Sequence, residues 1–221
     1  MQKKVCFITG VSRGIGRALA EKFLSEGYSV IGTSTSGKVD LNHKSLIVLK
    51  LDLSSTKSIE NFAKNFGKLN KKIDILVNNA GIWSGLEDSS EMRIDLLRKV
   101  LEVNLIGTID FTERLIPFIK DSGKIINVSS SAGSLSHMYY ADHPDYSISK
   151  AALNMYTRTL SFRLKQRKIT VNSIHPGWVE TDMGGKGADL KPSQAAQEVY
   201  DRIITLTETG QFWFKQDKFP W

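Results

Sequence analysis

Tyr146 and Lys150, four positions apart, are the pair of residues in this sequence best suited to acid–base chemistry. Side chains at positions i and i+4 share one face of a helix. A phenol ordinarily has a pKa of about 10, and a nearby ammonium lowers that pKa by favouring the ionised form, which prepares the phenol for proton transfer near neutral pH. Such a pair also arises by chance in many helices, so its meaning depends on its surroundings.

Polar residues end or interrupt three apolar stretches elsewhere in the chain. Serines 129–131 follow one expected strand, and Asn78–Gly81 ends another. The carboxyl ends of parallel strands border the ligand crevice of an open α/β sheet, so these side chains are candidates for substrate contact. Asn104 interrupts an apolar helical stretch, where asparagine is locally unfavourable. Serine also favours turns and an asparagine can face solvent, so each motif has a purely structural interpretation as well.

A glycine-rich turn joins the first expected strand to the first expected helix. Its glycines follow the spacing G-x-x-x-G-x-G. They permit a tight turn and let the backbone approach a pyrophosphate at the positive end of the helix. A helix cap or a bulge would also use glycine, but the strand–turn–helix context is that of a dinucleotide-binding loop. The predicted coenzyme contacts from this turn are Gly10, Ser12, Arg13, Gly14, Ile15 and Gly16.

The residues after the second expected strand indicate which dinucleotide is bound. An NAD site usually has an acidic residue there, which accepts hydrogen bonds from the adenosine ribose. Here the strand runs into Thr35 and Ser36 without a carboxylate. Arg13 in the glycine turn can hold a 2′-phosphate through its guanidinium, although a solvated loop charge is the alternative. The pattern favours NADP(H) over NAD(H).

Short β-like runs alternate with helical patterns along the whole chain, which is typical of βαβ units and a parallel sheet. The sequence therefore predicts an α/β fold: one doubly wound, Rossmann-type domain over residues 1–221, with a mostly parallel seven-stranded sheet and helices on both faces. The expected strands are Lys4–Thr9, Ser29–Ser34, Ser45–Lys50, Ile73–Asn78, Lys124–Ser129, Thr170–His175 and Gln211–Phe214. The expected helices are Ile15–Ser25, Thr56–Leu69, Asp95–Lys120 and Tyr146–Lys165.

Composition excludes several classes of protein. With 221 residues the chain can bury a core without disulfides or a structural metal. Its one cysteine, Cys6, forms no intramolecular disulfide. Its four histidines show no ligand spacing, so no metal site is expected. The start of the chain shows no signal peptide and no apolar run is long enough to span a membrane, so we expect a cytoplasmic protein.

The net charge of +7 favours anionic partners. The basic residues are dispersed and are not interleaved with aromatic residues as a single-strand platform requires. A nucleic-acid partner, which would show a steep salt dependence, is therefore a minor alternative to a phosphorylated coenzyme.

Taken together, these motifs resemble the short-chain dehydrogenase/reductase family in its compact branch. The resemblance extends from residue 4 to about residue 184 and includes the segment from Asn172 to Gly177. The stretch from His175 to Gly185 and the ending Thr209–Trp213 further resemble sniffer-like and C-factor-like carbonyl reductases.

The resemblance implies a catalytic role for four residues. Tyr146 would protonate the alkoxide that forms as hydride arrives from the nicotinamide, and Lys150 would lower the pKa of Tyr146 and bind the nicotinamide ribose. Ser130 would hold the carbonyl oxygen of the substrate. Asn104 would anchor a water that links Lys150 to solvent.

The resemblance also implies coenzyme contacts outside the glycine turn. Asp52, with Leu53 beside it, would meet the adenine, and the turn Asn79, Ala80 and Gly81 would line the adenine ribose. The contacts expected for the carboxamide and the phosphates are Pro176, Gly177, Val179 and Thr181.

Two features depart from the usual pattern of the family. Ser130 and Tyr146 are 16 positions apart, more than is common, so Ser129 or Ser131 is an alternative for the working hydroxyl. The extra residues, 134–145, are expected to form a wall of the substrate pocket. Little chain follows Met183, so the substrate lid is expected to be short.

The sequence thus predicts an NADPH-dependent reductase of a ketone, aldehyde or quinone. The resemblance implies a homodimer or homotetramer that pairs through the two long helices. The alternatives are an NADP(H)-binding redox sensor without turnover and an NAD-dependent alcohol dehydrogenase, since the same residues serve oxidation with Tyr146 as the base.

The coenzyme assignment predicts the effect of Thr35→Asp. A carboxylate at this position would repel a 2′-phosphate and accept hydrogen bonds from a free ribose, so the preference should shift towards NADH. The ratio of kcat/KM values for NADPH and NADH measures the shift, and an unchanged ratio would place Thr35 away from the adenosine ribose.

Overall fold

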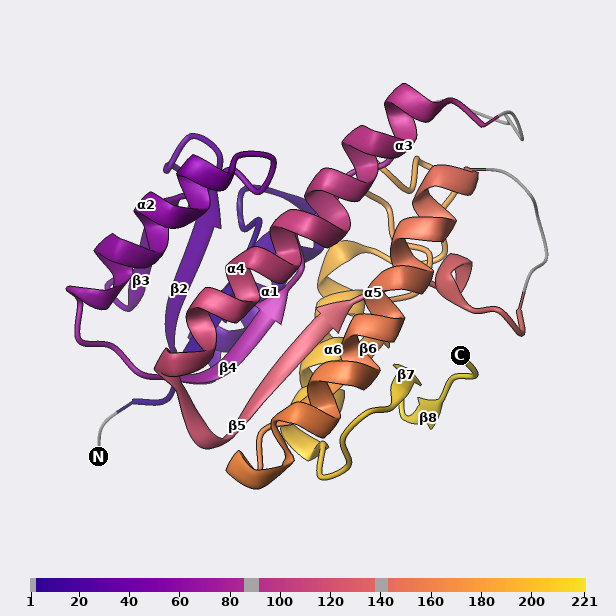
Figure 1. Ribbon diagram of the computed structural model, residues 1–221. Helices are drawn as coiled ribbons and strands as arrows, with labels where there is room; N and C mark the ends of the chain where they lie inside the picture. The colour runs from indigo at the N-terminus through magenta and orange to yellow at the C-terminus, as the bar shows by residue number, and fades with distance from the viewer. Residues whose placement is uncertain (1–2, 86–91, 138–142) are drawn as a thin grey trace.

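The computed structural model describes residues 3–85, 92–137 and 143–221 as an α/β fold around one sheet (Figure 1). The strand order is β3-β2-β1-β4-β5-β6-β7-β8, and all neighbouring strands are parallel except β7 and β8. The order reverses between β1 and β4, which places the topological switch point beside the glycine turn. The strands are β1 (Val5–Ile8), β2 (Ser29–Ser34), β3 (Leu46–Lys50), β4 (Ile73–Asn78), β5 (Ile119–Val128), β6 (Thr170–His175), β7 (Phe212–Phe214) and β8 (Asp217–Lys218).

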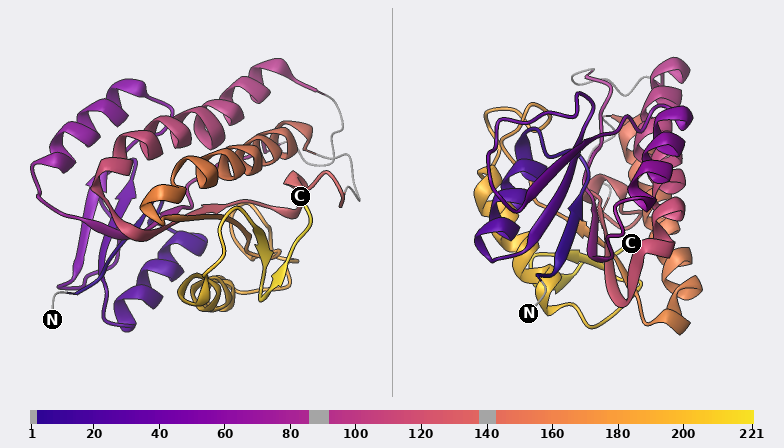
Figure 2. Two further views of the ribbon diagram at one scale, coloured as in Figure 1. Left: turned by 60° about the horizontal axis from the view of Figure 1, so that its bottom comes forward. Right: turned by 90° about the vertical axis from the view of Figure 1, so that its left-hand side faces the viewer.

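Helices cover both faces of the sheet, so the predicted fold class is confirmed (Figure 2). Two helices, α1 and α6, pack together on one face, and α2, α4 and α5 cover the other. The helices are α1 (Gly14–Ser25), α2 (Thr56–Gly67), α3 (Ile94–Leu101), α4 (Thr108–Leu115), α5 (Pro144–Arg163) and α6 (Pro192–Thr205).

Alternation along β1 gives each face of the sheet its own core. Ile8 points into a cluster with Phe23 of α1 and Ile203 of α6. Phe7 points the other way, where its ring packs edge-on against Phe62, at a centroid distance of 5.8 Å, within a second cluster. Burial on both faces explains why the central strands are almost entirely apolar.

The prediction of one continuous helix over Asp95–Lys120 is wrong, because the helical segment is interrupted and ends earlier. The structure divides it into α3, a π-helical turn (Glu102–Gly107) and α4, and β5 already begins at Ile119. Gly107 lies against the loop that precedes α2. A Cβ on Gly107 would be only 1.9 Å from the carbonyl oxygen of Leu53 in that loop. Pro117 lacks an N–H group, which favours the end of the helix just before β5.

The sheet has one more strand than the seven predicted. β8 contains only two residues and pairs antiparallel with β7, so it is too short to show a hydrophobic period. Helix α6 was not predicted either, although Pro192 at its first position is a common start signal. Across the described residues, the structure has no helix long and apolar enough to cross a membrane.

Candidate active site

The glycine turn after β1 is shaped by close backbone contacts. Gly10 and Gly14 adopt positive φ values of 73° and 58°, which favour glycine. A Cβ on Gly16 would lie 2.1 Å from the carbonyl oxygen of Gly10, so no side chain fits there. Ile15 and Gly16 follow in the first turn of α1, whose free N–H groups face the turn. This cradle has the form that a pyrophosphate needs.

The turn after β4 is bonded directly to the glycine turn. The Nδ2 of Asn79 donates to the carbonyl oxygens of Thr9 (2.9 Å) and Gly10 (3.2 Å). In return, Oγ1 of Thr9 accepts from the backbone N–H groups of Asn79 and Ala80, both at 3.0 Å. The side chain of Asn79 therefore holds the glycine turn in place, a role that the sequence did not predict.

Arg13 and the loop after β6 meet across the same crevice. The Nε of Arg13 lies 2.9 Å from a carboxylate oxygen of Asp182, and both side chains are more than three quarters exposed. A Cβ on Gly14 would lie 3.2 Å from Cγ2 of Thr181, so the two loops also touch next to this ion pair. An exposed ion pair is weak, and it leaves Arg13 available to an anionic ligand.

The loop after β6 has a compact internal structure. Gly177 follows Pro176 with a φ of 88°, and Val179 is buried, with its backbone bridged to Leu190. The N–H of Glu180 donates to the carbonyl oxygen of Leu190 at 2.8 Å. The N–H of Leu190 donates to the carbonyl oxygen of Trp178 at 3.1 Å. These bonds close the loop on itself and fix the position of Thr181 at its tip.

The adenosine end of the predicted site contains Thr35, Asp52 and Leu53. Thr35 follows β2 and is exposed, as a residue beside the ribose must be. One carboxylate oxygen of Asp52 accepts from the N–H (2.9 Å) and the hydroxyl (2.7 Å) of Ser54. Leu53 is buried. Ser12 is exposed in the glycine turn.

Lys150 is the buried charge of the candidate site. Its ammonium donates to the carbonyl oxygen of Val128 at 2.8 Å and lies 5.4 Å from the ring centroid of Tyr146. Burial lowers the pKa of Lys150 to about 8, because the charged form loses its hydration. The structure thus brings together the phenol and the ammonium that the sequence pairs on one helix face.

Asn104 lies in the π-helical turn and faces the same place. Its amide exchanges two hydrogen bonds with the backbone of Ile82, each 2.8 Å long, and its Nδ2 also donates to Ser149 at 3.1 Å. A Cβ on Gly81 would lie 3.2 Å from Oδ1 of Asn104 and 3.6 Å from Nζ of Lys150. Gly81 therefore lies directly beside both Asn104 and Lys150, where a larger side chain would crowd them.

The structure separates the three serines after β5 by their burial. Ser129 is buried, and its hydroxyl has no hydrogen-bond partner within the described part of the chain. Ser130 is half-buried, and its Oγ accepts from the N–H of Ala132 at 3.2 Å, at the start of a 3₁₀ turn (Ser131–Gly133). Ser131 is itself part of that turn. Of the walls expected from the insertion, residues 138–142 lie outside the described residues.

A chain of buried polar side chains supports this edge of the sheet, and sequence analysis missed it. Asn78 donates to Asn127 and Asn127 donates to Thr157, each at 2.8 Å, and Thr157 bonds the hydroxyl of Ser173 at 2.9 Å. The signal available in the sequence was an asparagine within each of three apolar strands, at positions 78, 127 and 172.

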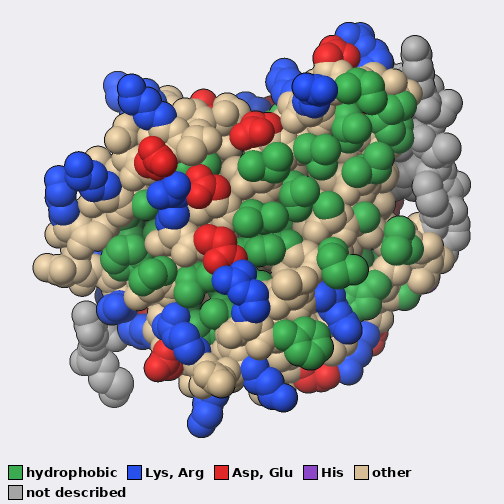
Figure 3. Space-filling view, in the orientation of Figure 1, with side chains coloured by type: hydrophobic (Ala, Val, Ile, Leu, Met, Phe, Trp, Pro, Cys, Tyr) green, Lys and Arg blue, Asp and Glu red, His purple; other side chains and the backbone are tan. Residues whose placement is uncertain are grey.

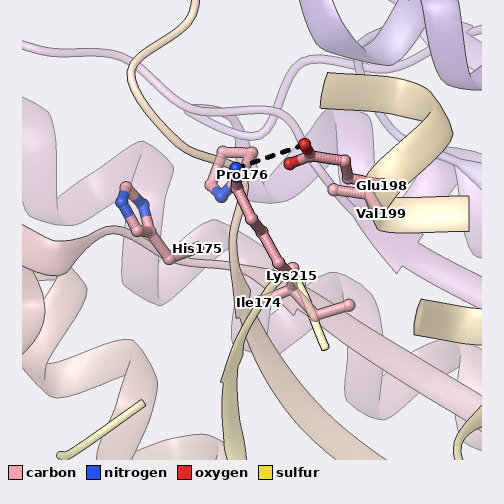
Figure 4. A pocket seen from close by; sticks show the side chains of 6 residues that line it. All are labelled: Ile174, His175, Pro176, Glu198, Val199 and Lys215. Carbon is pink, nitrogen blue, oxygen red and sulfur yellow. Dashed lines mark ion pairs between the residues drawn. The ribbon is translucent and has the colours of Figure 1, made fainter. Parts of the chain in front are cut away.

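A shallow surface pocket lies between the end of β6, helix α6 and the turn after β7 (Figure 4). Lys215 reaches across it towards Glu198, and their charged atoms are 3.4 Å apart. It contains none of the predicted catalytic side chains and shares only Pro176 with the predicted coenzyme contacts. Its lining residues are Ile174, His175, Pro176, Glu198, Val199 and Lys215.

Comparison with known proteins identifies the family. The model of the short chain dehydrogenase family matches residues 4–191, most of the chain. The chain belongs to the short-chain dehydrogenase/reductase family. A curated relative, the 3-oxoacyl-[acyl-carrier-protein] reductase FabG of Aquifex aeolicus, is 39% identical over 196 residues, which are 83% of this chain and 77% of the relative. The family predicted from the motifs is therefore confirmed.

Solved structures of short-chain dehydrogenases agree with this fold throughout. A family member from Burkholderia multivorans with bound NADP has a TM-score of 0.92 and 26% identity, and covers 100% of both chains. The carbonyl reductase Sniffer of D. melanogaster has a TM-score of 0.89 and 25% identity, again over 100% of both chains. The predicted likeness to sniffer-like reductases is thus supported.

His175 should make the stability of the fold sensitive to acid. Burial lowers its pKa to about 4, because the imidazolium would lose its hydration, whereas the unfolded value is about 6.5. The unfolded state therefore binds more protons between these values, and stability should fall as the pH falls through them. Between pH 7 and pH 4.5, wild type should lose about 2 kcal/mol more free energy of unfolding than His175→Asn. Urea unfolding at both pH values measures this, and equal losses would contradict it.

Proposed function

We propose that this protein reduces the carbonyl group of a ketone, aldehyde or quinone to an alcohol, with NADPH as the hydride donor. The observation that carries the proposal is the buried ammonium of Lys150 beside the ring of Tyr146. The glycine turn, the Asn79 turn and the Thr181 loop fit a dinucleotide. Bound NADPH would supply the hydride, and the protein would orient the carbonyl and move the proton.

Tyr146 is the proton donor in this proposal. As the carbonyl oxygen gains negative charge, the phenol of Tyr146 gives it a proton, and the positive charge of Lys150 stabilises the phenolate that remains. The hydroxyl of Ser130 donates a hydrogen bond to the same oxygen and orients it. The half-buried position of Ser130 favours it over the buried Ser129.

Asn104 and Gly81 serve the return of the proton. A water molecule beside Gly81, which has no side chain to exclude it, would link the ammonium of Lys150 to solvent. Both polar atoms of the Asn104 amide are bonded to the protein, so the side chain is rigid enough to hold the surrounding backbone around that water.

The preference for NADP(H) rests on Arg13 and on the uncharged Thr35. Arg13 lies at the open end of the glycine turn, where its exposed guanidinium can exchange Asp182 for a 2′-phosphate. The remaining coenzyme contacts are proposed as the resemblance implies, with Asp52 and Leu53 at the adenine, Asn79, Ala80 and Gly81 at the ribose, and Pro176, Gly177, Val179 and Thr181 at the carboxamide and phosphates. The structure with bound NADP from Burkholderia multivorans supports this choice. We also place the protein in the cytoplasm.

We further propose that two copies of the chain pair through the outer face of α4 and α5. Hydrophobic side chains gather over α3, α4 and α5 on this side of the molecule (Figure 3). Met155 and Phe162 of α5 are 67% and 70% exposed, and Ile106 and Ile148 are about half exposed. A contiguous apolar face of this kind is typical of a protein interface, and two-fold pairing would cover it in both copies.

Replacing Tyr146 with Phe tests the proposed reaction. The variant lacks the proton donor and should lose roughly 10²- to 10⁴-fold in kcat with a reactive dicarbonyl or a quinone. Its dissociation constant for NADPH, measured by nucleotide fluorescence, should change little. Full activity of Tyr146→Phe would refute the assigned acid, and tight NADPH binding without turnover by wild type would favour a redox sensor.

A charge on the outer face of α5 tests the pairing. Phe162→Glu should convert the dimer to a monomer in sedimentation experiments, because the carboxylate would be buried without a partner. Ile47→Glu is the matched control, since Ile47 is exposed on β3 at the far edge of the sheet. The same assembly in wild type and Phe162→Glu would place the interface elsewhere.

A further inference from the structure

The segment Phe219–Trp221 is hydrogen-bonded to the stretch of chain that follows the 3₁₀ turn Ser131–Gly133. The hydroxyl of Ser134 donates to the carbonyl oxygen of Pro220 at 2.9 Å. The carbonyl oxygen of Trp221 accepts twice from Ser136, from its N–H at 3.1 Å and its hydroxyl at 3.0 Å. The chain after β8 and the chain after β5, far apart in sequence, thus lie side by side (Figure 2).

Ser134 is the centre of this connection. It is only 3% exposed, and its hydroxyl also accepts from the N–H groups of Ser136 (3.3 Å) and His137 (3.2 Å). A single buried hydroxyl therefore shapes the backbone of residues 134–137 and attaches that backbone to Pro220.

Helix α5 holds the same turn from the other side. Nδ2 of Asn154 donates to the carbonyl oxygen of Gly133 at 3.1 Å. Gly133 lies so close to α5 that a Cβ there would be 2.7 Å from the carbonyl carbon of Lys150. Arg158, one turn further along the helix, lies over the ring of Trp221, 5.7 Å from its centroid.

These anchors continue a row that begins at the proton donor. Tyr146, Lys150, Asn154 and Arg158 are spaced four residues apart, so they share one face of α5. The first two belong to the candidate active site, the third holds the turn after Ser130, and the fourth holds Trp221. One helix face thus positions the phenol, the ammonium and the chain on both sides of the serine turn.

The aromatic rings anchor the segment in the sheet. Phe219 packs against His137 at 4.8 Å and against Phe212 of β7 at 5.1 Å between ring centroids. The ring of Trp221 stacks on Phe212 at 5.5 Å. Phe212 is a core residue, so the segment Phe219–Trp221 attaches residues 134–137 to the hydrophobic core.

We propose that Phe219–Trp221 is a positioning element of the active site, which fixes the Ser130 turn against α5 and so determines how a carbonyl substrate is held. This inference rests on the proposed function. The orientation of the Ser130 hydroxyl depends on the 3₁₀ turn, since Ala132 N–H donates to it and Gly133 N–H donates to the Ser130 carbonyl at 2.9 Å. If the chain after Gly133 moves, that turn moves with it.

Kinetics of Ser134→Ala and Trp221→Ala test the proposal. A displacement of about 1 Å in a positioning group can cost 100-fold, so a partial loosening should raise the KM for a bulky ketone by roughly tenfold. The dissociation constant for NADPH should stay within about twofold, because the glycine turn is on other elements. Trp221→Phe keeps the stacking on Phe212 and should restore the KM. Thr205→Ala is the control, since the Thr205 hydroxyl is at the end of α6 and donates to the carbonyl oxygens of Asp201 and Arg202 in the same helix.

Unchanged KM values in both alanine variants would overturn the proposal. An equal loss of NADPH binding would overturn it too, because the effect would then be a general loosening of the fold. Lack of rescue by Trp221→Phe would show that the ring does not act through its stacking, and would overturn the role given to Trp221.

Hydrogen exchange gives a result that does not depend on turnover. The amides of Ser136 and His137 should exchange about tenfold faster in Ser134→Ala, since each loses a bond or its support, whereas the amides of the glycine turn should be unaffected. Unchanged exchange at residues 134–137 would contradict the role of Ser134 in holding this stretch of backbone. If wild type reduces no carbonyl, the proposed function fails, and the exchange experiment still decides whether the segment holds this chain.

Discussion

The burial of one ammonium group governs the organisation of this protein. Lys150 is almost fully inside the molecule, where a charge is costly, and its ammonium contacts a carbonyl oxygen of β5 and the face of a tyrosine ring. Three features of the fold surround this charge: β5 ends at Val128, α5 carries Lys150 past that end, and Gly81 adds no side chain beside the ammonium. The same burial that lowers the pKa of Lys150 keeps its charge unscreened beside Tyr146.

The sequence was sufficient to predict the fold class and six of the strands closely. Buried parallel strands are nearly continuous apolar runs, and the glycine turn marks where the first strand passes into α1. The pair Tyr146 and Lys150 was predictable for a local reason, because helical spacing alone brings the two side chains together. Their confirmed proximity needed no knowledge of distant parts of the chain.

The parts that were missed depend on contacts between distant segments. The break of the long helix into α3, a π-helical turn and α4 follows from the approach of Gly107 to Leu53, which no local pattern reveals. The use of Asn79 to hold the glycine turn, and of Pro220 to hold Ser134, likewise joins residues that are far apart in sequence. Strand β8 is two residues long, which is shorter than any periodicity can indicate.

That short strand has a consequence for how copies of the protein meet one another. Without β8, the aromatic strand β7 would present its unpaired backbone groups to solvent, and such an edge invites strands of other molecules to add to the sheet. The two residues of β8 are Asp217 and Lys218, both exposed and of opposite charge. They pair with the backbone groups of β7, and they end the sheet with a very short, charged edge strand. This border disfavours aggregation by sheet extension.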